Sequence, residues 1–255
     1  MIKISAVIIT YNEERNIERC IKSLQGVVDE IIVVDSFSSD ATASICNTLN
    51  IKLILHKFEG HIQQKNWAIT QASYPYVLSV DADEVLSEKL KNSILQTKNN
   101  WQADGYTLNR MTSYCGKWIK HGGWYPDKKL RLWDSRKGKW AGINPHDKYE
   151  MHKNCKVLHL KGDLLHYSYH SLKDHTEQVE KFTSITANAL YKNGKKASFV
   201  QLFFGSSIKF VRNYFIKLGF LDGYHGFRIA KISAYATFLK YAKLKELHHN
   251  NKLQK

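Results

Sequence analysis

The chain has 255 residues, of which 43% are hydrophobic and 24% charged, a composition typical of a folded protein. A chain of this length buries enough apolar surface to fold without disulfides or structural metals, and its four cysteines form no C-x-x-C pair, which argues against a zinc ribbon or a redox motif. The formal net charge is +15, and no apolar run reaches the ~20 residues that a transmembrane helix needs.

The first hundred residues alternate between short β-branched runs and amphipathic segments. A helix capped by Asn12 would carry Ile17, Ile21 and Leu24 on one face. Repeated β-α-β units predict an α/β fold with a mostly parallel sheet and helices on both of its faces. The expected strands are Lys3–Thr10, Glu30–Asp35, Lys52–His56 and Tyr76–Val80, and the later helices contain Ile45 and Leu49, then Gln63–Ala72, then Leu90 and Ile94 behind a Ser87 cap.

The pattern changes after Asp104, where mixed strands and glycine-rich, aromatic-lined loops replace the β-α-β rhythm. Ser171 can cap a helix that runs to about Lys192, and the chain is helical again from Phe199. We therefore divide the chain into segments 1–104, 105–192 and 193–255. The strands expected in the middle segment are Gly105–Met111, a stretch around Lys129–Trp133, and one or two strands within Val157–Tyr167.

Polar residues follow three of the predicted parallel strands. Because ligands bind beyond the carboxyl ends of strands in open parallel sheets, we expect these residues to form one acidic, hydrogen-bonding pocket. They are Thr10, Tyr11, Asn12 and Glu13 after the first strand, Asp35 at the end of the second, and Asp81, Asp83 and Glu84 after the fourth.

Asp81 and Asp83 form a D-x-D pair directly after the apolar run YVLSV. Two carboxylates at the end of a strand suit Mg²⁺ or Mn²⁺, hard cations that commonly bridge carboxylates to substrate phosphates. The alternative is a helix N-terminus decorated with acids. With Asp35 at the end of a neighbouring strand, the metal interpretation is favoured, and Asp35 itself can accept hydrogen bonds from a base or a ribose. Tyr11 either packs on that base or is an ordinary half-exposed aromatic.

Three segments resemble the signature segments of glycosyltransferase family 2, whose members have the GT-A fold. They are Ser5–Glu14 (SAVIITYNEE), Ile32–Thr42 (IVVDSFSSDAT) and Leu78–Glu84 (LSVDADE). Three later segments resemble the branch of lipopolysaccharide core glucosyltransferases: Lys117–Trp133 (KWIKHGGWYPDKKLRLW), Leu165–Tyr169 (LHYSY) and Leu218–Gly226 (LGFLDGYHG). The resemblance covers nearly the whole chain.

The resemblance implies an inverting hexosyltransferase that uses a nucleotide-sugar donor, by analogy a UDP-sugar. Residues 1–104 would form the nucleotide-sugar-binding half of a GT-A domain, 105–192 its acceptor-side half, and 193–255 a basic helical extension. Thr10, Tyr11, Asn12 and Glu13 would border the nucleotide, Asp35 would bind the base, Asp81 would contact ribose or metal-bound water, and Asp83 would ligate the metal. His166 is either a third metal ligand, as a histidine is in several related enzymes, or an ordinary structural histidine. Glucose would be the sugar, and a saccharide or lipid-linked core the acceptor.

The catalytic base must reach the acceptor hydroxyl directly or through one water. Asp127, in WYPD, and Asp147, in NPHD, are equal candidates, and each can instead be a turn residue beside a proline. His146-Asp147 stands where many relatives carry a His-Glu pair, and the Glu-Asp base motif of the wider family is absent. Arg131 can stabilise the departing diphosphate. Its alternative is a solvated position on a strand whose Leu130 and Leu132 face inward.

Most of the positive charge lies near the end of the sequence, where residues 191–255 hold thirteen Lys and Arg but only Asp222 and Glu246, a balance of 13 − 2 = +11. Aromatic and basic residues alternate from Phe199 to Phe220, which suits the surface of an anionic membrane. No signal peptide is visible. We therefore expect a cytoplasmic protein, peripheral on the inner face of the membrane; the alternative is a helix packed on the catalytic domain with solvated lysines.

Other functional classes fit less well. The sequence has no RRM, KH or zinc-finger signature, so we expect no specific nucleic-acid partner. It has neither the G-x-G-x-x-G of a dehydrogenase nor a P-loop after its first strand. A catalytically inactive GT-A-like scaffold or nucleotide-binding protein remains the main alternative, although the intact Asp35, Asp81 and Asp83 argue against it.

Overall fold

The computed structural model describes the backbone of residues 1–143 and 146–253. The chain forms two compact units, the first made of Met1–Met111 and Asp127–Tyr167, and the second of Thr112–Pro126 and Ser168–Lys255. The segment predicted as 105–192 thus contributes to both units. The assignment of separate functions to 1–104, 105–192 and 193–255 stays a prediction.

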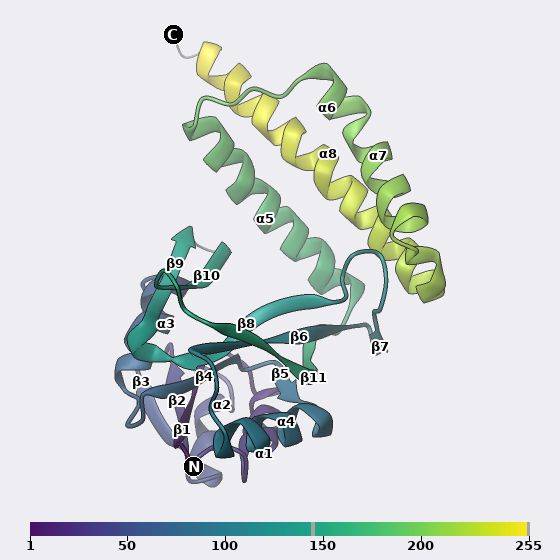
Figure 1. Ribbon diagram of the computed structural model, residues 1–255. Helices are drawn as coiled ribbons and strands as arrows, with labels where there is room; N and C mark the ends of the chain where they lie inside the picture. The colour runs from purple at the N-terminus through teal and green to yellow at the C-terminus, as the bar shows by residue number, and fades with distance from the viewer. Residues whose placement is uncertain (144–145, 254–255) are drawn as a thin grey trace. The chain divides into compact units, whose positions relative to one another are not determined.

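Most of a mixed sheet lies in the first unit, with the strand order β3-β2-β1-β4-β8-β6-β11-β5 (Figure 1), and β7 pairs with the end of β6 within the second unit. The first four strands in this order are parallel, whereas β8 pairs antiparallel with both β4 and β6, and β5 pairs antiparallel with β11. A separate hairpin joins β9 and β10. The strands are β1 (Ile4–Thr10), β2 (Glu30–Asp35), β3 (Lys52–Leu55), β4 (Tyr76–Asp81), β5 (Glu84–Leu86), β6 (Gly105–Tyr114), β7 (Lys117–Trp118), β8 (Asp127–Asp134), β9 (Gly138–Ile143), β10 (His146–Met151) and β11 (Val157–Tyr169).

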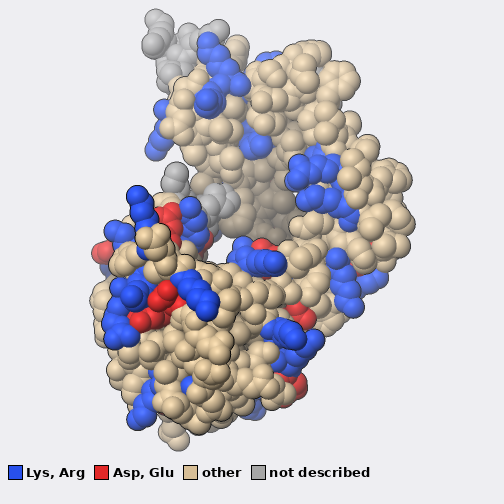
Figure 2. Space-filling view, in the orientation of Figure 1, with Lys and Arg blue, Asp and Glu red and all other residues tan. Residues whose placement is uncertain are grey.

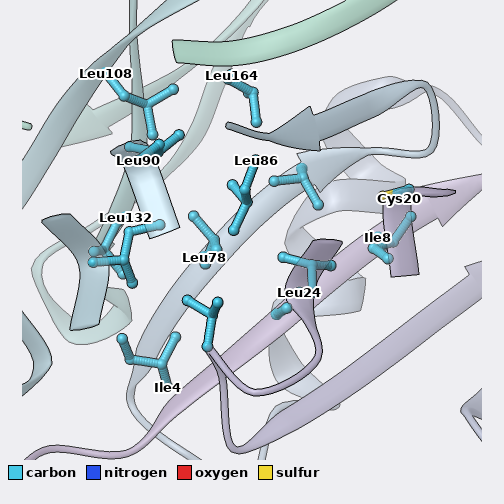
Figure 3. Close-up of a cluster of buried hydrophobic side chains, with 14 of the residues drawn as sticks. Ile4, Ile8, Cys20, Leu24, Leu78, Leu86, Leu90, Leu108, Leu132 and Leu164 are labelled. Atoms are coloured by element: carbon cyan, nitrogen blue, oxygen red, sulfur yellow. The ribbon is translucent and has the colours of Figure 1, made fainter. Parts of the chain in front are cut away.

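Helices cover both faces of the sheet, as the β-α-β pattern predicts. Alternate residues of a strand point to opposite faces, so Ile4, Ala6 and Ile8 of β1 join one buried cluster while Val7 joins another. The first cluster includes side chains of α1, α2 and α4, and ten of its residues are labelled in Figure 3. The second includes Ala68 of α3. These helices are α1 (Ile17–Leu24), α2 (Thr42–Thr48), α3 (His61–Thr70) and α4 (Glu88–Asn99).

Two details of the first unit differ from the prediction. The helix expected at Asn12 begins only at Ile17, because Asn12 adopts a left-handed backbone with φ 54° and its side chain binds the loop after β2 instead. The short strand β5 and the β9–β10 hairpin were not predicted, since three-residue and glycine-containing strands carry little periodic signal. Ser87 does cap α4, and its hydroxyl accepts a hydrogen bond from Leu90 N.

The second unit is helical. Ser171 caps α5 with a capping box, its hydroxyl accepting a hydrogen bond from Asp174 N, and α5 packs along α8 (Figure 1). None of the helices in the described part of the chain combines the length and apolarity that a membrane crossing requires. The elements are α5 (Leu172–Lys192), α6 (Phe199–Phe203), α7 (Gly205–Val211), a π-helical turn (Arg212–Ile216), a 3₁₀ turn (Gly219–Asp222) and α8 (Gly223–Leu253).

Two of the segments that resemble the core glucosyltransferase branch meet in this second unit. Asp222 is 4% exposed, and its carboxylate accepts hydrogen bonds from the backbone N–H groups of Lys120 (3.2 Å) and His121 (2.8 Å). Its backbone carbonyl accepts a further hydrogen bond of 2.9 Å from Lys117 Nζ. Asp222 therefore fixes the loop after β7 against the start of α8, a contact that neither segment reveals alone.

Candidate active site

The carboxyl ends of β1, β2 and β4 lie next to one another. In the parallel register Thr10 stands opposite Asp35, and Ile9 stands opposite Asp81. β1 lies between β2 and β4, so the polar ends of all three strands share one edge of the sheet. This arrangement brings together the residues that the sequence analysis assigned to a nucleotide pocket.

The loops after β1 and β2 hold each other in place. Asn12 N donates a hydrogen bond of 2.8 Å to Ser38 Oγ, and Ser39 N donates one of 2.8 Å to Asn12 Oδ1. Ser38 in turn donates to Asp35 from its backbone N (2.8 Å) and from its hydroxyl. Asp35 is fully buried, so its carboxylate orders the loop that borders the pocket. Contact of Asp35 with a base stays a prediction.

Tyr11 and Glu13, also predicted to border the nucleotide, differ in exposure. Tyr11 is 59% exposed and free to pack on a ligand. Glu13 N donates a hydrogen bond of 2.8 Å to Thr42 Oγ1, and the Glu13 carboxylate accepts one of 2.6 Å from Asn16. Burial raises the pKa of Glu13, although the bond from Asn16 opposes that rise. Glu13 is therefore a partly buried acid at the start of the loop into α1.

Asp81 lies between two cations. Lys65 Nζ of α3 is 3.1 Å from its Oδ1, and Arg131 Nη2 of β8 is 2.7 Å from its Oδ2. Burial alone would raise the pKa of Asp81, but Arg131 and Lys65 outweigh burial and hold that pKa well below its usual range. Both oxygens of Asp81 are thus in ion pairs that favour its ionised form.

Both base candidates belong to the ion-pair network that surrounds Asp81. Lys65 also binds Asp147 (2.9 Å), Arg131 Nη2 also binds Glu84 (2.7 Å), and Arg110 connects Glu84 (3.7 Å) to Asp127 (2.8 Å). Lys129 is a second cation on Asp127, at 3.1 Å. The network therefore alternates in charge from one base candidate to the other, in the order Asp147, Lys65, Asp81, Arg131, Glu84, Arg110, Asp127. The side chain of His146 lies outside the described residues.

Arg131 is buried, with its side chain 4% exposed, so the solvated alternative does not describe it. Its Nη2 donates to Asp81 and to Glu84, whose side chain is fully buried. The Nε and Nη1 atoms are buried and have no hydrogen-bond partner among the described residues. Arg131 neutralises two acids beside the pocket, and direct contact with a departing diphosphate stays a prediction.

Asp83 and His166 lie next to the network and form a mixed oxygen–nitrogen pair, with His166 Nε2 3.1 Å from Asp83 Oδ2. Burial lowers the pKa of His166, but the charge of Asp83 and the bond to it raise that pKa above the usual value. A carboxylate and an imidazole at this distance suit a divalent cation. Asp81, the third predicted ligand, faces Lys65 and Arg131 instead, and the described residues contain no group of three or more His, Cys, Asp or Glu side chains arranged around a metal.

Lys65 was not predicted as a member of the site, and Glu84 was placed in the acidic pocket without a role. Lys65 is 7% exposed and lies three residues before the buried Ala68 on α3, so it is a charged residue on the apolar face of a helix. A charge in that position requires a buried partner, and this was the available signal. Glu84 follows the D-x-D pair directly; its Oε2 accepts a hydrogen bond of 2.9 Å from Asp81 N.

The fold defines the class of the protein as one with the GT-A fold. The TarS fragment 1–349 of S. aureus, solved in complex with UDP-GlcNAc, superimposes with a TM-score of 0.52, covering 98% of this chain and 92% of that one at 16% identity, which supports the fold. The family model of glycosyl transferase family 2 matches residues 5–155, and the chain belongs to that family.

Curated relatives match over almost the whole chain. An uncharacterized glycosyltransferase of Rickettsia typhi is 34% identical over 97% of this chain and 88% of its own length. The lipopolysaccharide core biosynthesis glycosyltransferase LpsC of Rhizobium meliloti is 28% identical over 96% of this chain and 93% of its own length. The resemblance to family 2 is therefore confirmed, and a relative in lipopolysaccharide core synthesis agrees with the branch suggested by the sequence.

Proposed function

We propose that the protein transfers a hexose, with inversion, from a UDP-sugar to a saccharide or lipid-linked acceptor of the lipopolysaccharide core. Membership in family 2 supports sugar transfer, and the relation to LpsC supports the acceptor class. Glucose is the sugar of the branch that the sequence resembles. The observation that carries the proposal is the shared edge of Thr10, Asp35 and Asp81 with Asp83 beside it.

The donor would lie along this edge. Asp35 and the loop that it orders would receive the base, with the exposed Tyr11 ring against it. Asp81 is kept ionised by Lys65 and Arg131, so it can accept hydrogen bonds from ribose hydroxyls or from metal-bound water at any physiological pH. Arg131 and Lys65 would also place positive charge near the diphosphate, where negative charge grows as the sugar departs.

Asp83 and His166 would hold Mg²⁺ or Mn²⁺. When bound, the cation would supply positive charge that stabilises the diphosphate leaving group. The raised pKa of His166 reflects its pairing with Asp83, and a ligand imidazole must be neutral, so binding of the metal would compete with a proton on His166.

The base would be Asp127 or Asp147, each held by cations of the ion-pair network. A carboxylate in that network would take the proton of the acceptor hydroxyl while the hydroxyl oxygen attacks the anomeric carbon from the side opposite the nucleotide. The new glycosidic bond forms as the bond to the diphosphate oxygen breaks, which inverts the configuration.

We place this reaction in the cytoplasm at the inner face of the membrane, with the protein bound peripherally to anionic lipid. The support is the balance of +11 over residues 191–255 together with exposed aromatic side chains in the same region. Nucleic acid, the other polyanion that such a charge attracts, would bind only without sequence preference.

The test is calorimetric titration of UDP into the wild type with and without Mn²⁺, repeated on Asp83→Ala. We expect metal-dependent binding that is lost in Asp83→Ala and retained in the control Glu88→Ala, which removes an acid that is 85% exposed. Equal binding by Asp83→Ala would contradict the metal site. Absence of binding by UDP, GDP and TDP under all conditions would favour the alternative of an inactive scaffold.

A further inference from the structure

An exposed apolar surface covers part of the helical second unit. Fourteen large apolar side chains between Phe199 and Phe238 are exposed among the described residues, including Phe204 (56%), Ile208 (62%) and Phe215 (55%). Phe204 lies at the junction of α6 and α7, Ile208 lies within α7, and Phe215 lies in the π-helical turn that follows, so exposed apolar side chains occur in all three parts of this segment. Singly exposed apolar residues are ordinary, but a contiguous set of this size marks an interaction surface.

An apolar groove runs between α7 and α8 within this surface. It has a volume of about 420 Å³ and is open to solvent along its length. Its lining includes the apolar or aromatic residues Phe210, Val211, Tyr235 and Phe238 and the cation Lys231.

The charges interleaved with these apolar residues have one sign. From residue 193 to 255 the sequence contains only two acids, and one of them, Asp222, is buried and bound by the loop after β7. Burial lowers the pKa of Lys209, and the neighbouring cations Arg212, Lys217 and Lys240 lower it further. In Figure 2 the region of α6, α7 and the neighbouring part of α8 shows Lys and Arg but no Asp or Glu on the visible face.

This clustering of like charges decides between two occupants. In a two-fold dimer formed through this face, both contacting surfaces would carry the same cations, which places like charges together. An anionic lipid surface instead offers negative headgroups to the cations and acyl chains to the aromatic side chains, in the arrangement of an interfacial amphipathic helix.

We infer that the face formed by α6, α7 and α8 docks on an anionic phospholipid bilayer, with Phe204, Ile208 and Phe215 inserted at the interface and Lys209, Arg212 and Lys217 against the headgroups. The inference rests on the proposed peripheral location and assigns it to a surface. It does not depend on sugar transfer, so it can be tested without donor or acceptor.

The test is sedimentation of the full chain with vesicles of phosphatidylcholine alone or with 30% phosphatidylglycerol. Wild type should bind the mixed vesicles and bind those of phosphatidylcholine alone far more weakly. Lys209→Glu combined with Arg212→Glu should weaken binding to the mixed vesicles by roughly 30-fold or more, since each basic residue near such a surface contributes about a fivefold factor. Phe204→Ser with Ile208→Ser and Phe215→Ser should weaken it by roughly 100-fold.

A matched control replaces exposed apolar residues of the first unit, Leu55 (55%) and Phe58 (47%), by serine and should bind as the wild type does. If the charge-reversal variant and the triple serine variant both bind the mixed vesicles as the wild type does, the assignment to this face is wrong. The peripheral location would then still stand. Absence of binding by the wild type would contradict both, but not the nucleotide site, which calorimetry reports separately. A concentration-dependent dimer in sedimentation velocity that the serine variant abolishes, without vesicle binding, would identify a second copy as the occupant.

Discussion

Replacing Arg131 by methionine should destabilise the first unit through the acids that it leaves behind. Arg131 bridges Asp81 and Glu84 at 2.7 Å each, and the Glu84 side chain is fully buried. Methionine fills most of the volume but supplies neither the charge nor the donors. Two carboxylates that were compensated in the wild type would then share a site with Lys65 and a distant Arg110 as their remaining cations.

Removal of one partner from a buried ion pair costs about 3–5 kcal/mol in the free energy of unfolding. In Arg131→Met, Asp81 still pairs with Lys65, and the Asp81 side chain is 29% exposed. We therefore expect a loss at the lower end of this range, about 3 kcal/mol. For a unit of this size each kcal/mol shifts the melting temperature by roughly 2–4 °C, which predicts a decrease of about 10 °C at neutral pH.

The unfolding free energy lost in Arg131→Met should depend on pH with a definite sign. Because Arg131 and Lys65 hold the pKa of Asp81 below its unfolded value, the wild type gains stability from Asp81 above the unfolded pKa of about 4, and loses it as the pH falls through the folded value. Arg131→Met should lose most of the stabilisation that ionised Asp81 contributes in the wild type. The difference in unfolding free energy between the wild type and Arg131→Met should therefore be largest at pH 7 and should decrease below about pH 4.

Denaturant and thermal unfolding of both proteins from pH 3 to 8 provide the measurement. The control is Lys148→Met, which breaks an ion pair of 2.8 Å to Glu150 between side chains that are 69% and 49% exposed, and which should shift the midpoint little. A melting temperature of Arg131→Met within 2–3 °C of the wild type at pH 7, or a gap that does not change with pH, would refute the bridging role assigned to Arg131.

Two further predictions concern catalysis and the second unit. Of Asp127→Asn and Asp147→Asn, the variant that removes the base should lower kcat by roughly 10²–10⁴-fold while calorimetry shows unchanged UDP binding, and small losses in both would place the base elsewhere. Asp222→Ala leaves the backbone N–H groups of Lys120 and His121 without their acceptor and should reduce the unfolding free energy by about 2 kcal/mol, with faster hydrogen exchange in the loop after β7. Asp222→Asn keeps one acceptor oxygen and should lose less unfolding free energy. Unchanged hydrogen exchange in the loop after β7 of Asp222→Ala would show that this contact does not hold the loop.

The sequence was most informative where the signal is local. β1, β2 and β4 have the predicted bounds to within one residue, because fully buried parallel strands are continuous β-branched runs. The caps at Ser87 and Ser171 were confirmed because a cap depends on only four residues. Asn12 was misassigned as a cap because the same side chain that caps a helix also binds the neighbouring loop after β2, and local sequence does not distinguish the two.

The shared edge also follows from local rules, since β-α-β connections make the first four strands parallel and place Thr10, Asp35 and Asp81 at their common carboxyl end. The pairing of the charges does not follow from them. Lys65 and Asp147 are 82 residues apart, and Arg131 and Asp81 are 50 apart, so no periodicity predicts that they meet. The same holds for Asp222 and the loop after β7, more than a hundred residues away.

By itself, the sequence determined the family, the parallel arrangement of the first four strands and the acidic edge, because these depend on residue patterns within one element or one β-α-β unit. The tertiary structure alone decided which cation neutralises which acid, that Asp81 faces two cations while Asp83 faces His166, and that apolar side chains of α6–α8 stay exposed. The physical reason is that ion pairs and burial depend on distances in space between segments that the chain brings together only when it folds.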